Sequence, residues 1–136
     1  DHEYWMDKAI LQAKLSRKPY GAVVKNQDDD FIQAYNTVAT DGATAHAEMN
    51  ALYKLKDFNY EEAKNLTLYT TVEPCPMCMS AIIWTGIGTV VYGASINDAS
   101  QFGNQIFISS DEVAKQSWYD LQLVKNVKRD TCMQLF

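Results

Sequence analysis

Long apolar runs are missing from this sequence of 136 residues. Each apolar stretch is interrupted well before the roughly 18 residues that a membrane-spanning helix needs, so we expect no membrane segment and no membrane partner. Residues 1–5 include acidic side chains where a secretory signal peptide carries basic ones, and no leading apolar block follows. These two absences predict a cytoplasmic protein.

Basic side chains are also scarce, because 12 Lys and Arg residues stand against 17 Asp and Glu residues and give a net charge of −5. A protein that grips a long polyphosphate backbone usually presents a basic surface. A local basic patch can still lie within an acidic total. The balance therefore counts against a large nucleic acid as the partner without excluding one.

Only three cysteines are present, namely Cys75, Cys78 and Cys132. An odd number of cysteines in a chain without a secretory signal argues against a disulfide framework. It favours thiolate chemistry in a reducing compartment.

The overall composition is that of a globular protein, with 47% hydrophobic and 21% charged residues. The chain is long enough for one compact domain with a core and too short for two ordinary domains. We therefore expect residues 1–136 to form a single domain, without internal repeats or linkers.

Apolar periodicity and turn residues divide the chain into helices and strands. Helices are predicted over residues 3–17, 46–55, 76–85 and 111–119, strands over 22–24, 31–35, 66–72, 89–92 and 121–127, and a short helix or tail over 129–136. The strand, helix and strand between residues 66 and 92 form a parallel crossover unit, which requires a sheet covered by helices. The fold class is therefore α/β. A loop over residues 93–105, after the carboxyl end of a strand, is long enough to indicate a functional role.

Soft metal ligands are concentrated in two short motifs, His46-Ala47-Glu48 and Cys75-Pro76-Met77-Cys78. Zinc favours imidazole nitrogen and thiolate sulfur, and a catalytic zinc site uses three protein ligands. His46, Cys75 and Cys78 provide that number. Both motifs lie at predicted helix N-termini, where the helix dipole favours deprotonated thiols. The sequence therefore predicts one catalytic Zn²⁺ ion.

The residues beside the histidine supply two further functions. Glu48 lies two residues after His46, so its carboxylate can take a proton from water and deliver it to a ring nitrogen and a departing amine. The backbone N–H of Ala47 can hold a substrate oxygen or ring acceptor at the start of the helix. These transfers are the ones that hydrolytic deamination requires. Tyr20 and Trp84 are the aromatic residues that we expect near the substrate.

A protein of a different class, a zinc-stabilised binding module without catalysis, is the alternative. It would need a fourth ligand, and Cys132 or His2 are the candidates. Against it, Glu48 would have no purpose in a closed site. We expect Cys132 to be a small buried thiol and His2 to be a solvated residue near the terminus.

Residues 44–52 and 73–82, which contain both motifs, resemble the cytidine deaminase superfamily. Within it, the sequence is similar to the branch of guanine deaminases, yeast-type cytosine deaminases and tRNA wobble adenosine deaminases. The resemblance implies a three-layer α/β/α fold around a five-stranded mixed sheet, one catalytic zinc, Glu48 as proton shuttle and usually a homodimer. It also implies that Asn36, after the second strand, binds the base or nucleoside.

This resemblance implies that the substrate is a nucleobase or a related amino-heterocycle, and guanine is the leading candidate. Residues 19–23, Pro76-Met77 and residues 81–84 resemble bacterial guanine deaminases. Residues 44–48 are shared with the tRNA enzymes, so tRNA wobble adenosine stays an alternative, as do cytosine and nucleosides. The segment after Gly93 does not clearly match any branch.

Overall fold

The computed structural model describes residues 1–136 and is built on a five-stranded mixed sheet with the strand order β2-β1-β3-β4-β5. The strands are β1 (Gly21–Lys25), β2 (Phe31–Tyr35), β3 (Thr67–Val72), β4 (Thr89–Ala94) and β5 (Gln122–Val124). β1 pairs in an antiparallel sense with β2 and β3, and β4 runs parallel to β3 and β5. The predicted five-stranded mixed sheet is confirmed.

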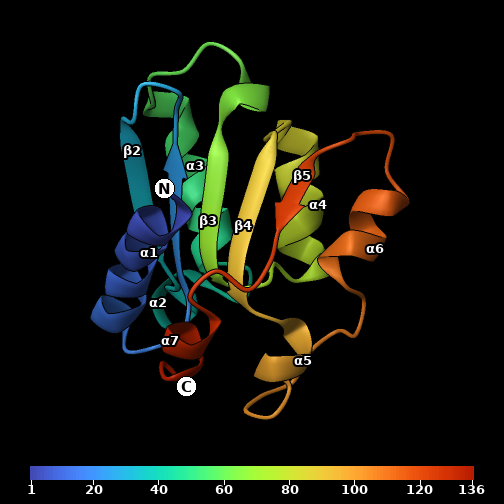
Figure 1. The fold of residues 1–136 in the computed structure, drawn as a ribbon. Coiled ribbons are helices and arrows are strands. Elements are labelled where there is room, and N and C mark those ends of the chain that lie inside the picture. Colours follow the sequence, from blue (N-terminus) through green and yellow to red (C-terminus); the bar gives the residue numbers. More distant parts are fainter.

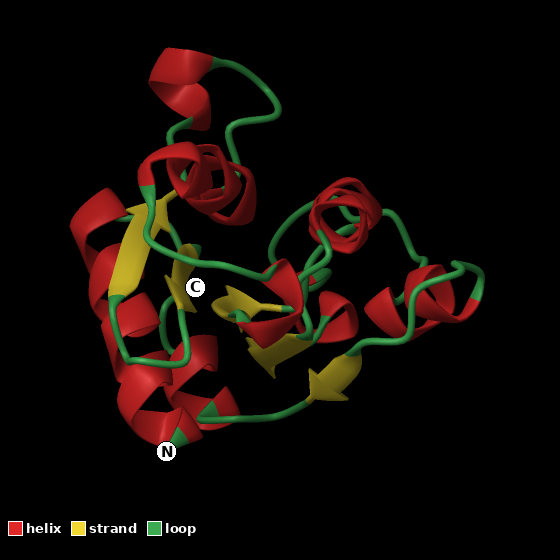
Figure 2. Cartoon of the chain, turned by 90° about the horizontal axis from the view of Figure 1, so that it is seen from above, coloured by secondary structure: helices red, strands yellow, loops and turns green.

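Helices cover both faces of this sheet (Figures 1 and 2). The longer helices are α1 (His2–Ser16), α3 (Ala47–Lys54) and α4 (Pro76–Thr85), and the shorter ones are α2 (Val38–Asp41), α5 (Ile96–Ala99), α6 (Ser110–Lys115) and α7 (Arg129–Met133). Short 3-10 turns occupy Leu55–Asp57 and Ala63–Asn65. α1 and α7 lie on one face, and α3 and α4 lie on the other (Figure 1). The protein therefore has the three-layer α/β/α architecture.

Two separate cores form because successive strand residues point to opposite faces of a sheet. Leu68 of β3 is buried in the core beneath α3 and α4, and its neighbour Tyr69 is buried in the core beneath α1 and α7. Val90 and Val91 of β4 divide in the same way. The central strands are buried on both faces, which explains their nearly continuous apolar sequence.

The structure departs from the predicted elements mainly in the second half of the chain. The predicted loop over residues 93–105 contains helix α5, which begins with a capping box formed by Ser95 and Asp98. The last strand is shorter than predicted, and left-handed residues follow it at Asn126 and Lys128, with φ of 62° and 55°. None of the helices is long and apolar enough to cross a lipid bilayer.

Helix α5 is tied to helix α7 by an ion pair between Asp98 and Arg129. The guanidinium donates from Nε to Oδ2 at 2.9 Å and from Nη2 to Oδ1 at 2.7 Å. These bonds, more than the opposing effect of burial, lower the pKa of Asp98 to about 2. Because the folded pKa is below the ordinary value of 3.8, the pair contributes stability above about pH 4. That contribution is lost as the pH falls towards 2.

Replacing Asp98 with Asn is therefore expected to destabilise the protein at pH 6 by about 1 kcal/mol, since the exposed Arg129 makes solvent screening strong. The difference in free energy of unfolding between the two proteins should narrow as the pH falls from 6 to 3. Urea denaturation of both proteins at the two pH values measures this difference. A difference that did not change with pH would mean that the carboxylate charge of Asp98 does not stabilise the fold.

Candidate active site

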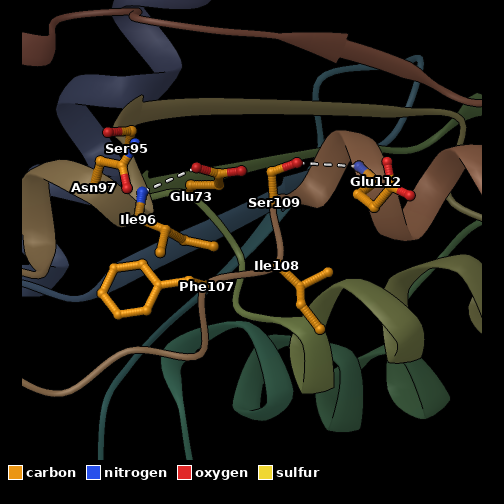
Figure 3. Close-up of a pocket in the computed structure, with 8 residues that line it drawn as sticks. All are labelled: Glu73, Ser95, Ile96, Asn97, Phe107, Ile108, Ser109 and Glu112. Carbon is orange, nitrogen blue, oxygen red and sulfur yellow. Dashed lines mark hydrogen bonds between the residues drawn. The ribbon is translucent and has the colours of Figure 1, made fainter.

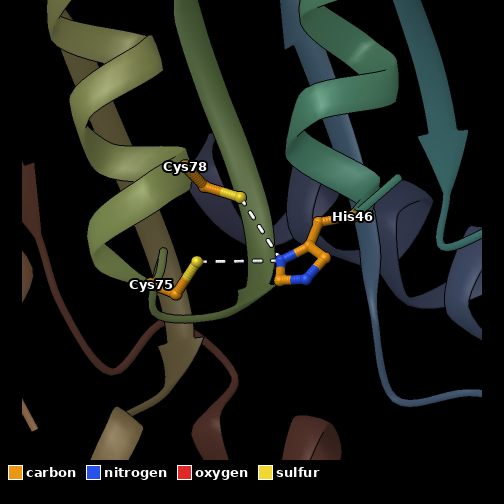
Figure 4. Close-up of side chains that lie close together, drawn as sticks. All are labelled: His46, Cys75 and Cys78. Atoms are coloured by element: carbon orange, nitrogen blue, oxygen red, sulfur yellow. Dashed lines mark hydrogen bonds between the residues drawn. The ribbon is translucent and has the colours of Figure 1, made fainter. Parts of the chain in front are cut away.

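The first turns of α3 and α4 bring the three predicted metal ligands together (Figure 4). His46 is the N-cap residue of α3, and Cys75 is the N-cap residue of α4, with Pro76 next to it in the first turn. Cys78 follows in that same turn. Pro76 fits there because the first N–H groups of a helix have no intrahelical partner. Both helices therefore point their N-termini at the same point.

The distances between the ligand atoms fit a zinc ion. His46 Nδ1 lies 3.5 Å from Cys78 Sγ and 3.7 Å from Cys75 Sγ, and all three ligand atoms lie within 4.8 Å of one another. A nitrogen and a sulfur that bind one tetrahedral zinc ion are about 3.6 Å apart. The existing side-chain positions thus suit zinc without rearrangement.

The electrostatics of the cluster also favour a cation. A hydrogen bond from the Cys78 thiol, followed by one from His46, lowers the pKa of Cys75 to about 4 despite burial. The pKa of Cys78 is raised because its thiol is the donor to Cys75 and because it is buried. The two thiols are therefore not equivalent, and Cys75 is the more readily deprotonated of the two. A bound metal replaces the remaining proton, since metal ligands must be deprotonated.

No fourth protein ligand approaches this cluster. Cys132 is buried in the core beneath α1 and α7, against Gly93 of β4. His2 lies at the start of α1, where Nδ1 is 2.9 Å from the hydroxyl oxygen of Tyr69. Glu48 is not part of the ligand cluster either. Three protein ligands leave one position open, which is the arrangement of a catalytic zinc site rather than a structural one.

A pocket of about 420 Å³ opens beside the ligands, within the size range of small-molecule sites. It is lined by Tyr20, Asn36, Ala43, His46, Glu48, Val72, Glu73, Cys75, Met77, Asn104, Gln105 and Ile106. Carboxamides, which both donate and accept hydrogen bonds, are prominent in this wall. The pocket can therefore hold a flat polar heterocycle next to the metal ligands.

Glu48 is almost fully buried at the pocket, with 5% of its surface exposed. Burial is the main reason why its pKa is raised to about 7, and the negative charge of Cys75 adds to the rise. A nearby cation acts in the opposite direction, because it favours the carboxylate form. A carboxyl group whose pKa is raised by burial and lowered by a nearby cation can exchange protons near neutral pH.

The sequence profile of the cytidine and deoxycytidylate deaminase zinc-binding region matches residues 1–94. The chain belongs to this family of zinc-dependent deaminases. The match includes all three ligands and Glu48, so the zinc cluster and the deaminase activity of the family occur in the same part of the chain.

Curated relatives of this deaminase have different substrates in their names. A tRNA-specific adenosine deaminase from Buchnera aphidicola is 31% identical, and the alignment covers 97% of this chain and 89% of that protein. A guanine deaminase from Bacillus subtilis is 38% identical, and the alignment covers 76% of this chain and 70% of that protein. A crystal structure of a protein in complex with 8-azaguanine has a TM-score of 0.85 at 21% identity, covering 99% of this chain and 83% of that one, and shows the same fold.

The structure brings most of the predicted substrate residues of the deaminase to the pocket. Tyr20 and Asn36 line it, and Ala47 is buried beside it as the first residue of α3. Trp84 does not reach it. This residue is six positions past Cys78, about 9 Å further along α4, and is 76% exposed in contact with Trp118. The substrate role predicted for Trp84 is therefore withdrawn.

Three polar residues in the pocket wall were not individually predicted from the sequence. Asn104 and Gln105 come from the segment after α5. The sequence predicts a functional loop there without indicating which of its residues face the pocket. Glu73 directly follows β3 and is buried. An acidic residue at the carboxyl end of a buried strand was the only sequence signal that could have indicated it.

Proposed function

We propose that this deaminase acts on guanine and replaces the exocyclic amine of the purine with a carbonyl group, releasing ammonia. The observation that carries the proposal is the position of Glu48, buried between a three-ligand zinc site and a pocket lined by carboxamides. Water supplies the oxygen of the new carbonyl. The amine leaves with the protons that it needs to become ammonia.

Glu48 is proposed as the proton carrier of this reaction. Zinc, when bound, supplies a Lewis acid that activates water at neutral pH. The Glu48 carboxylate accepts one proton of the attacking water and delivers it to a ring nitrogen, and it then accepts the second proton of the same water and passes it to the departing amine. Its buried side chain has little competition from bulk water, so the proton stays within the site.

Asn36, Tyr20 and Ala47 are proposed to hold the base. The Oδ1 atom of Asn36 accepts a hydrogen bond from the N–H of Val38 at 3.1 Å, which leaves its amide NH₂ group for a ring nitrogen or carbonyl oxygen. Tyr20 presents an aromatic surface and a hydroxyl group at the same pocket. The N–H of Ala47, in the first turn of α3, has no intrahelical partner and can bind a substrate oxygen.

Guanine is preferred over the anticodon of tRNA because the protein is acidic. A net charge of −5 disfavours binding to a long polyphosphate. The guanine deaminase relative at 38% identity and the neighbouring structure with 8-azaguanine support a free purine. The tRNA deaminase relative aligns over more of the chain and keeps tRNA adenosine as the second candidate.

Ammonia release separates these candidates. The zinc-loaded protein is incubated in turn with guanine, adenine, cytosine, their nucleosides and a tRNA anticodon stem-loop. We expect the highest kcat/KM for guanine and no turnover of the stem-loop. Turnover of the stem-loop without turnover of guanine would replace guanine with tRNA adenosine. No turnover of any of these compounds by zinc-loaded protein would rule out guanine and point to another amino-heterocycle.

A homodimer is part of the proposal. Trp84, Trp118, Phe107 and Ile108 are exposed around α4 and α6, and the two tryptophan rings lie 4.7 Å apart between centroids. Soluble monomers rarely expose apolar side chains in such groups. A second copy of the chain is the proposed occupant of this surface, and sedimentation equilibrium should then give twice the mass of one chain.

A further inference from the structure

Glu73 connects the starts of two short helices, and it lines both the substrate pocket and a second, neighbouring pocket, which Figure 3 shows with the bond to Ile96. Its Oε1 atom accepts a hydrogen bond from the N–H of Ile96, the first residue of α5, at 2.9 Å. Its Oε2 atom accepts from both the N–H and the hydroxyl of Ser110, the first residue of α6, at 2.7 Å each. The side chain is 6% exposed. One buried carboxylate therefore joins α5, α6 and the end of β3.

Helix α5 is also held by its ion pair to Arg129, but residues 101–109, between α5 and α6, have few contacts within the chain. Residues 101–109 are exposed except for Gln105, which is half-buried. Between residues 103 and 108 there is one backbone–backbone hydrogen bond, from the N–H of Ile108 to the carbonyl of Ile106. Within one chain, hydrophobic burial therefore contributes little to the order of this segment, apart from the stacking of Phe102 on Phe136.

The same segment forms one wall of the substrate pocket. Asn104, Gln105 and Ile106 line the pocket together with the metal ligands His46 and Cys75 and with Glu48. Tyr20 and Gln105 line the same pocket. The position of this wall consequently depends on the two ends that Glu73 holds.

We propose that Glu73 is a positioning residue that fixes residues 101–109 as the wall of the pocket and thereby sets the affinity for the substrate. The proposal rests on the deaminase function proposed above and assigns no contact between Glu73 and the reacting atoms. Hydrogen bonds to a charged carboxylate are about twice as strong as neutral ones, which suits an anchor for an exposed segment. An amide cannot replace it, because its NH₂ group would face a backbone N–H at one of the two ends.

Hydrogen–deuterium exchange of the zinc-loaded protein tests the anchor directly. In Glu73→Gln we expect the amides of Ile96 and Ser110, whose hydrogen bonds the carboxylate accepts, to exchange at least tenfold faster, while β3 amides keep their protection. Ser110→Ala removes only the hydroxyl donor and should produce a smaller change in the same region. Ile87→Val, a conservative change in the core beneath α3 and α4, is the control for general loss of stability. Unchanged exchange of the Ile96 and Ser110 amides in both Glu73→Gln and Ser110→Ala would overturn the proposal.

Steady-state kinetics with guanine tests the consequence. Glu73→Gln should raise KM about tenfold or more and change kcat less than threefold, with full zinc content. A fall in kcat with loss of zinc and no change in KM would overturn the proposal, because Glu73 would then act through the neighbouring ligand Cys75. If Glu73→Gln does not fold, Ser110→Ala must also raise KM, although by a smaller factor. Wild-type protein that does not deaminate guanine refutes the proposed substrate, while the exchange experiment still decides the role of the anchor.

Discussion

Replacing Glu48 with Gln is expected to lower kcat for deamination by roughly 10²–10⁴-fold, which is the usual contribution of a positioned general acid and base. Gln has the same shape as Glu, so the buried site keeps its packing, but the amide cannot carry the proton from water to the ring and the amine. KM should change little, since the proposed base contacts come from Asn36, Tyr20 and Ala47. Zinc should stay bound with one ion per chain, because Glu48 lies outside the ligand cluster.

The measurement combines ammonia release with zinc content on the same preparation. Glu73→Gln is the matched control, because it also exchanges a buried carboxylate beside the pocket for an amide. The two variants should differ in kind, one lowering kcat and the other raising KM. Loss of zinc from Glu48→Gln would make Glu48 a ligand and refute its role as proton carrier. Normal kcat with zinc present would assign the proton transfer to another group.

The zinc ligand set could be predicted from the sequence because its determinants are local. Cys75 and Cys78 lie within one helical turn, and Pro76 marks where that turn begins. The caps at His46 and Cys75 place both motifs at helix N-termini. Only the meeting of the two helices is a long-range event, and the crossover pattern predicted no more than that helices cover the sheet.

The wall of the pocket could not be predicted in the same way. Asn104 and Gln105 lie in an exposed segment without periodicity, so nothing in the sequence around them indicates which way they face. Their position depends on Glu73, which is distant in sequence and whose partners are mainly backbone groups. The Ser95-x-x-Asp98 capping box was present in the sequence and could have revealed α5, but the small residues around it resembled a loop.

Trp84 was predicted to lie near the substrate because it is close in sequence to the cysteines, but it is not close to the site in space. It shares α4 with both cysteines, yet a helix rises 1.5 Å per residue and turns by about 100° at each step, so it lies on another side of the helix and further from the site. Metal ligands at the first turn of a helix therefore say little about residues in its last turn. Many of the residues that line the pocket come instead from loops, whose sequences carry the weakest structural signal.

Removing one thiolate is expected to affect both metal binding and stability. Cys78→Ser should lower zinc affinity by orders of magnitude, because a serine hydroxyl is a harder and much less acidic ligand than a thiol. Catalysis should be lost with the metal. The wild-type protein should also lose activity after chelation and regain it when Zn²⁺ is restored, whereas Cys78→Ser should not regain it at the same zinc concentration.

Thermal unfolding with and without zinc measures the same interaction independently of any substrate. A ligand present at 1,000 times its dissociation constant stabilises the folded state by about 4 kcal/mol, so zinc should raise the Tm of the wild type by several degrees and that of Cys78→Ser far less. Cys132→Ser is the matched control, since Cys132 is equally buried but lies in the opposite core. Equal zinc-dependent shifts in Cys78→Ser and the wild type, or loss of the shift in Cys132→Ser, would contradict the three-ligand site. Because the readout is metal binding, it tests His46, Cys75 and Cys78 as a unit whichever amine the enzyme removes.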